Sequence, residues 1–315
     1  RVQVRCVFCT IMSLHEYGER DRHIETFVLT LVMFVALLIG VLNGDFLSPQ
    51  AQTRIGGSAF IPNILLAVFR TLAAGLSLFT VISVCLDREG GPAIPLFYKS
   101  RKCEQAVLYG SHRLVAFTVW SFIAFGAYFA LAAFASWAEI FGLSVPSWLL
   151  AVIPLIFAIA CGTALLVTVV VTYYLIPNNL EKGFDVAKYF LWYEIVMHNL
   201  NVILLGVDLV LGGVDITLGM VAFPVLFGIV YVFFAYIYAI YGGGIYLYDF
   251  LDPRVSRAPL IHIGLFVMIA LFYSVALALD ALVDWNVIAG GLGVAVCIYS
   301  IVRFREPVRA GFQSP

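Results

Sequence analysis

The stretch LWYEIVMHNLNVILLGVDLV, residues 191–210, is apolar enough to form a helix inside a lipid bilayer, yet it carries several polar side chains. Residues spaced 4, 3, 4 and 3 positions apart fall in one stripe along a single helix face, and here they are Glu194, His198, Asn201, Leu205 and Asp208. A charged side chain facing lipid at the bilayer centre is energetically costly. We therefore expect the stripe to face the protein interior or a wet cavity.

The composition of the whole chain is that of a polytopic membrane protein. Hydrophobic residues make up 63% of the 315 residues and charged residues 12%, and the mean hydropathy is +1.01. Soluble globular domains carry about 25% charged residues. The net charge of −1 provides no broad basic field to attract nucleic acid, so we expect no nucleic-acid partner.

Apolar segments of the length that a bilayer requires, about 20 helical residues, occur eight times. They cover residues 24–42, 60–86, 114–136, 148–176, 189–211, 219–241, 260–283 and 286–302. The sequence therefore predicts an all-α transmembrane bundle of about eight helices. We expect a single membrane domain over 24–302, with polar tails at 1–23 and 303–315.

Lysine and arginine are distributed almost entirely to one side of these predicted helices. Of the 18 basic residues, only Arg54 lies in a loop on the other side, and only Arg70 lies within a predicted helix. Basic loops face the cytoplasm or its topological equivalent. This rule places both termini on that side.

Metal and cofactor chemistry finds little support in the sequence. Cys6 and Cys9 form a C-x-x-C pair, but no second pair or nearby histidine pair completes a zinc or redox site. All four lysines lie outside the apolar segments, which excludes a retinal-type pigment, and only His262 could join His198 in a bis-histidine haem site. We expect no cofactor and no metal.

The chain start bears on localisation. Residues 1–15 are basic and contain no acidic residue, as the remnant of a transit peptide would, although Met12 also suits a natural start. An inner mitochondrial membrane and the endoplasmic reticulum are both compatible with this sequence.

Three motifs carry a resemblance to a known family. They are FTVWSFIAFGAYF at 117–129, MHNLNVILLGVDL at 197–209 and GGGIYLYDFLD at 242–252. In their order, spacing and placement, they resemble motifs of the androgen-induced-gene and rolling-stone family of polytopic membrane proteins, over residues 60–302. The segment 24–42 is an additional N-terminal helix relative to that family.

The resemblance implies an active site made of Thr118 and His198. In the family, a Thr and a His at these places hydrolyse fatty acid esters of hydroxy fatty acids, and no cofactor is needed. A hydroxyl becomes a good nucleophile when a base takes its proton, which the imidazole could do. From helical spacing we expect Glu194 or Asn201 to orient the imidazole. Tyrosine hydroxyls and Asn199 are candidate oxyanion donors.

Depth in the membrane separates the two proposed partners. At 1.5 Å of rise per residue, Thr118 lies about 6 Å from the basic surface and His198 about 14 Å. Another branch of the family resembles an acyltransferase with a cysteine nucleophile. Cys161 is predicted at nearly the depth of His198, so it is the reserve nucleophile, beside its simpler interpretation as a small buried hydrophobic residue.

Two functions remain open from sequence. The first is an intramembrane lipid ester hydrolase or acyltransferase that uses Thr118 and His198 on a fatty-acyl ester. The alternative is a non-catalytic, lipid-binding or structural subunit of a larger membrane complex, for example in an energy-converting organelle. In that case the stripe on 191–210 only joins helices by hydrogen bonds. Membrane lipids are partners in both.

Overall fold

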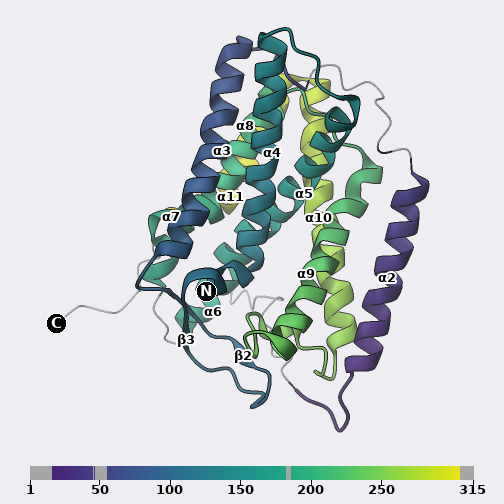
Figure 1. Ribbon diagram of the computed structural model, residues 1–315, viewed down its shortest axis with the longest axis vertical. Helices are drawn as coiled ribbons and strands as arrows, with labels where there is room; N and C mark the ends of the chain where they lie inside the picture. The colour runs from purple at the N-terminus through teal and green to yellow at the C-terminus, as the bar shows by residue number, and fades with distance from the viewer. Residues whose placement is uncertain (1–15, 45, 47–54, 182–185, 306–315) are drawn as a thin grey trace, which may run out of the picture.

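The computed structural model describes residues 16–44, 46, 55–181 and 186–305, and it is almost entirely helical. Cys6, Cys9 and Arg54 lie outside these residues. The main helices are α2 (His23–Asn43), α3 (Asn63–Leu86), α4 (Phe117–Ile140), α5 (Ser147–Val170), α8 (Asn201–Leu211), α9 (Ala222–Tyr241), α10 (Ala258–Trp285) and α11 (Val287–Ile301). They form the elongated bundle seen in Figure 1.

Two of the membrane-spanning stretches contain a π-helical turn. The first continues α5 through the π turn Val171–Leu175 into α6 (Ile176–Glu181), and the second joins α7 (Trp192–Ile195) to α8 through the π turn Val196–Leu200. Counting these continuous stretches, seven helices among the described residues are long and apolar enough to cross a membrane, and α11 is a shorter apolar helix. The prediction of an all-α transmembrane bundle is confirmed.

Residue chemistry at the helix ends explains where the chain turns. Gly142, with φ of +67°, follows α4, and the N–H of Leu143 donates to the Ala138 carbonyl at 2.8 Å. This is a glycine-dependent helix stop, because residues with a side chain rarely adopt this φ. At the turn between α10 and α11, the Asn286 side chain accepts from the N–H groups of Ile288 and Ala289, which caps α11.

The long loops at the basic end fold onto each other. In the loop between α3 and α4, β1 (Gly91–Ala93) pairs with β3 (Ala106–Leu108). From the same loop, β2 (Leu96–Phe97) pairs with β4 (Ile245–Tyr246), which belongs to the loop after α9. The second pairing joins segments about 150 residues apart in sequence, and it brings residues 242–252 under the start of α4.

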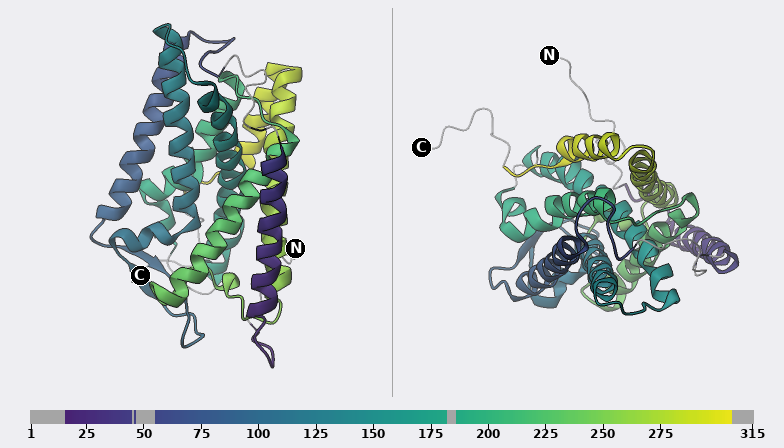
Figure 2. Two further views of the ribbon diagram at one scale, coloured as in Figure 1. Left: turned by 45° about the vertical axis from the view of Figure 1, so that its right-hand side comes forward. Right: turned by 90° about the horizontal axis from the view of Figure 1, so that it is seen from above.

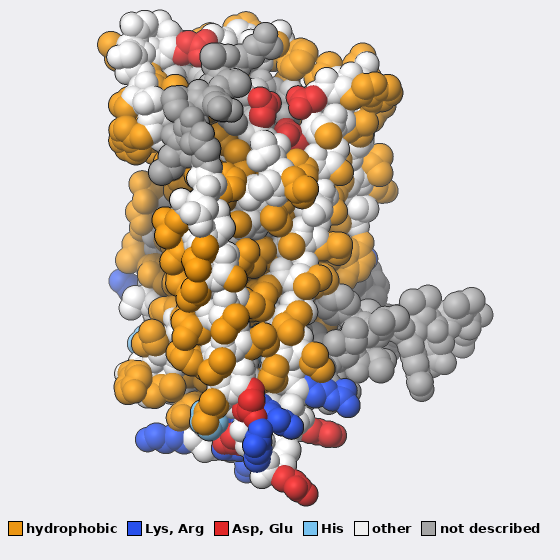
Figure 3. Space-filling view, turned by 90° about the vertical axis from the view of Figure 1, so that its right-hand side faces the viewer, with side chains coloured by type: hydrophobic (Ala, Val, Ile, Leu, Met, Phe, Trp, Pro, Cys, Tyr) orange, Lys and Arg blue, Asp and Glu red, His pale blue; other side chains and the backbone are white. Residues whose placement is uncertain are grey.

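The outer surface divides into three zones, which Figure 3 shows on one face. Lysine and arginine gather at one end of the molecule, acidic side chains are found at both ends, and hydrophobic side chains cover the middle. Leu72, Val267 and Val296 are examples of large apolar side chains that are more than half exposed on this middle zone. Such a surface matches the hydrocarbon core of a bilayer, so the chain is an integral multi-pass membrane protein.

Helix α2 lies at the periphery of the bundle, beside α9 and α10 (Figure 2). Phe27 and Phe34 pack their rings against Phe233 of α9, and the Thr26 hydroxyl donates to the Pro253 carbonyl. The remaining core is formed mainly by α3, α4, α5 and α8, with a second cluster between α9, α10 and the loop at 245–251.

Candidate functional site

The stripe on residues 194–208 faces the protein interior, as the cost of exposing it to lipid requires. His198 is 6% exposed, Asn201 2%, Leu205 2% and Asp208 0%, whereas Glu194 is partly exposed. The π turn around His198 changes the helical register between its two ends. The stripe consequently separates into two polar groups with different partners.

Asp208, at the C-terminal end of the stripe, forms a buried ion pair with Arg70 of α3. The Asp208 carboxylate accepts from Arg70 Nε at 2.9 Å and from Nη2 at 3.2 Å, and the Tyr128 hydroxyl also donates to it. Arg70 additionally donates to the Ser136 hydroxyl and to the Gly212 carbonyl, each at 2.9 Å. Both charged side chains are 0% exposed. With its donors satisfied in this way, the network is a structural one that joins three helices.

The other end of the stripe forms a cluster near the basic surface. Arg113, just before α4, donates to Asp87 at 3.0 Å and to Glu194 at 3.3 Å. The Tyr193 hydroxyl donates to Asp87 at 2.8 Å, and this hydrogen bond is the main cause that holds the pKa of Asp87 below its usual range. The second oxygen of Glu194 lies 3.5 Å from His198 Nδ1. Glu194 therefore lies beside the imidazole, as helical spacing predicted.

Asn201 and Asn199 have other roles than those predicted. Asn201 Oδ1 accepts from the N–H of Val202 and from the Thr168 hydroxyl, which also donates to the His198 carbonyl at 2.6 Å. These contacts satisfy the π turn, and none joins Asn201 to the imidazole ring. The Asn199 amide bonds both backbone groups of Arg303 and so holds the segment after α11. In this structure Asn199 is committed to the backbone and not to an oxyanion position.

Thr118 is the second residue of α4, and it lines an apolar cavity of about 100 Å³ between α4, α5, α9, α10 and the loop after α9. Three lining residues carry hydroxyls: Thr118, Tyr231 and Tyr248. The Tyr231 hydroxyl donates to the Val115 carbonyl at 2.8 Å, which places it at the start of α4 together with Thr118. The other lining residues are Phe117, Leu166, Val167, Val170, Val171, Leu175, Gly228, Val232, Phe250, Leu251, Leu265, Phe266 and Ile269.

Tyr248 connects Thr118 to the rest of the polar residues at this end. Burial raises the pKa of Tyr248, and hydrogen bonds from Thr118 partly offset that rise, while the charge of Glu194 adds to it. Burial and, to a lesser extent, Glu194 also raise the pKa of Tyr189, whose ring centroid is 6.4 Å from that of His198. Tyr248 thus interacts with both Thr118 and Glu194, and Tyr189 packs beside His198.

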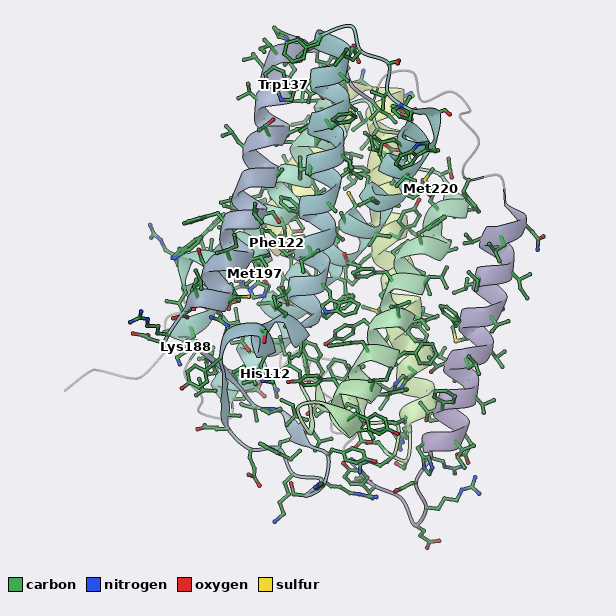
Figure 4. All side chains as sticks on the ribbon, in the orientation of Figure 1. His112, Phe122, Trp137, Lys188, Met197 and Met220 are labelled. Carbon is green, nitrogen blue, oxygen red and sulfur yellow. The ribbon has the colours of Figure 1, made fainter. Side chains whose placement is uncertain are left out.

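The predicted Thr118–His198 pair does not form a direct contact. No hydrogen bond joins the two residues in the part of the chain that the structure describes, and His198 does not line the cavity that contains Thr118. Thr118 lies at the start of α4, four residues before Phe122, whereas His198 lies in the π turn that joins α7 to α8; Figure 4 labels Met197, the residue before His198, below Phe122 in that view.

Cys161 and His262 also have defined surroundings. Cys161 is 6% exposed and lines a small apolar cavity of about 30 Å³ together with Cys297, with no acid–base residue in its lining. His262 Nε2 pairs with the Tyr236 hydroxyl at 2.6 Å and its Nδ1 with the Ala258 carbonyl at 2.8 Å. Both nitrogens of His262 are therefore occupied, one by a hydrogen bond to α9 and the other by a hydrogen bond within α10. Within residues 16–44, 46, 55–181 and 186–305, no group of three or more His, Cys, Asp or Glu could hold a metal ion.

Fold and site together define a polytopic all-α membrane protein with one hydroxyl-lined apolar cavity and a separate acid–histidine cluster. Comparisons with protein-family models, with curated proteins and with solved structures give no match. Function is therefore argued from the residues of this chain.

Proposed function

We propose that this membrane protein binds the acyl chain of a lipid in the cavity between α4, α5, α9 and α10. The observation that carries this function is the distribution of polarity in the cavity: its hydroxyls converge on the start of α4, and its other side chains are apolar. A cavity without polar groups along most of its wall stays dry and takes apolar ligands. The polar end would face a carbonyl or carboxyl group, and the apolar wall would face methylenes.

The depth of the cavity matches that of acyl chains in the membrane. Leu265 lies seven residues from the basic end of α10, and Gly228 lies 13 residues from the basic end of α9. At 1.5 Å per residue, these positions are about 10 Å and 20 Å from the helix ends. A lipid in the basic-side leaflet would have its acyl chain at this depth.

The first test is the lipid content of the purified protein. After gentle solubilisation and extensive washing, we expect one acyl-chain lipid per chain to remain by mass spectrometry of the intact particle. The same particle mass shows whether other subunits are bound, which tests the alternative of a larger complex. Purified protein that carries no lipid, and that binds none when fatty acids are added back, would contradict the function.

Lipid ester hydrolysis at Thr118 is a second candidate, favoured by the cavity position of this hydroxyl and by the acid–histidine pair beyond Tyr248. In such a step the Thr118 oxygen would bond to the acyl carbonyl carbon as its O–H bond breaks, and the alcohol would leave with a proton. Water would then release the acyl group and restore the hydroxyl. Tyr248 is the side chain beside the Thr118 hydroxyl. His198 would act on Thr118 through Tyr248.

Replacement of Thr118 separates binding from hydrolysis. If the chain is an esterase, Thr118→Ala should reduce turnover of a fatty-acyl ester in detergent by about 100-fold or more, while lipid retention persists. The control is Thr118→Ser, which keeps a hydroxyl and should keep activity. Equal turnover in wild type and Thr118→Ala would eliminate hydrolysis at this residue and leave lipid binding intact.

A further inference from the structure

The described residues of the cluster around Glu194 contain more carboxylates than cations. Among the residues that the structure describes, Arg113 is the cation that hydrogen-bonds to Asp87 and to Glu194, so these two carboxylates share one guanidinium. Arg113 is 6% exposed, and the side chains of Asp87 and Glu194 are 19% and 20% exposed. With a neutral imidazole on His198, the cluster has one net negative charge. Burying an uncompensated charge is costly, and one additional proton removes that cost.

The geometry provides a place for that proton between Glu194 and His198. One Glu194 oxygen accepts from Arg113, and the other lies 3.5 Å from His198 Nδ1. This imidazole nitrogen is buried and has no hydrogen-bond partner in the described part of the chain. A buried polar nitrogen without a partner is uncommon, and a proton between these two atoms would satisfy it.

Other groups around the pair leave this charge balance unchanged. Tyr189 before α7 and Tyr248 after α9 approach the pair, and the ring of Tyr193 on α7 packs against Arg113. The Arg303 guanidinium, from the segment after α11, lies over the Tyr173 ring, at 5.8 Å from its centroid, although the Arg303 backbone is bonded to Asn199. Within the described part of the chain, the charged groups in contact with Glu194 are thus Arg113 and, when protonated, His198.

We propose that Glu194 and His198 together hold one proton, which makes this pair a proton-binding site within the membrane domain. The partial exposure of Asp87 and Glu194 at the basic end gives the proton its route from that side. His198 and Glu194 do not line the cavity, so the proton-binding site is distinct from the acyl-chain cavity.

The direct test uses wild-type protein in lipid nanodiscs near neutral pH. Nitrogen NMR of histidine-labelled protein reports whether the His198 ring carries two protons, with His198→Asn identifying its signal. Infrared spectroscopy reports whether a carboxyl group is protonated, with Glu194→Gln identifying its band. We expect one of the two signals to be present. A neutral His198 ring together with an ionised Glu194 would overturn the assignment, and this wild-type result requires no variant to fold.

Variants then test the charge balance. In Glu194→Gln, Arg113 and Asp87 already neutralise each other, so we expect a neutral His198 ring and a loss of one bound proton per chain. Glu139→Gln is the control, because Glu139 is an exposed carboxylate at the opposite end, bonded to Asn63. It should leave the His198 signal unchanged. An unchanged His198 charge in Glu194→Gln, alongside an ionised Glu194 in wild type, would refute proton sharing.

Discussion

Asp208→Asn is expected to destabilise the protein by about 3–5 kcal/mol, the cost of leaving a buried charge without its partner. Asn has nearly the shape of Asp, so packing is preserved and the change acts on charge. Arg70 would remain fully buried beside a neutral amide, with Ile55, Ser136 and Gly212 as its remaining partners. The free energy of unfolding in mixed micelles, followed by tryptophan fluorescence, measures the loss.

A matched control for this substitution exists at the surface. Asp21 accepts two hydrogen bonds from Arg101, at 2.9 and 2.6 Å, but both side chains of this pair are partly exposed. Water and ions screen such a pair, so Asp21→Asn should cost at most about 1 kcal/mol. Equal losses in the free energy of unfolding for both substitutions would contradict the large contribution to stability assigned to the Asp208–Arg70 pair.

Gly228→Leu is expected to abolish acyl-chain binding by filling the cavity. A Cβ atom added at Gly228 would lie 2.3 Å from the end of the Ile269 side chain, which also lines the cavity. Ile269 can move because it is flexible, but the leucine and the displaced isoleucine would then occupy the cavity itself. We expect at least a tenfold loss of retained lipid, measured by mass spectrometry of the intact protein.

Gly264→Leu is the control for this loss. Gly264 is an exposed residue of α10 that does not line the cavity, and an added Cβ would meet nothing within 4 Å. The same change in residue type and helix propensity therefore occurs outside the cavity. Lipid retention should stay at the wild-type level. An equal loss in both variants would indicate a general effect on the bundle instead of an effect on the cavity.

Hydropathy and basic-residue placement predicted the helices well because both follow from the cost of placing polar groups in hydrocarbon. The predicted segment 24–42 corresponds to His23–Asn43, and 60–86 to Asn63–Leu86. Which helices pack against each other depends on the tertiary structure, and local sequence patterns do not reveal it. Arg70 and Asp208 were both recognised as intramembrane charges, yet their pairing requires the relative positions of α3 and α8.

Prediction of the site was less complete for two physical reasons. The π turn at Val196–Leu200 shifts the helix register, so spacing alone misplaced Asn201 relative to the imidazole but correctly placed Glu194. Tyr248 lies in a loop, and β-pairing of that loop with the segment before α4 brings it to Thr118. No helical period connects those residues, although the motif at 242–252 had indicated that the loop matters.

Photo-cross-linking with a fatty acid that carries a diazirine in its chain tests acyl-chain binding most directly, because α10 has a cavity face and a lipid face. We predict labelling at Leu265, Phe266 and Ile269, which line the cavity, and loss of this labelling in Gly228→Leu. Labelling confined to Val267 and Leu271, both 56% exposed on the outer face, would contradict the proposed function.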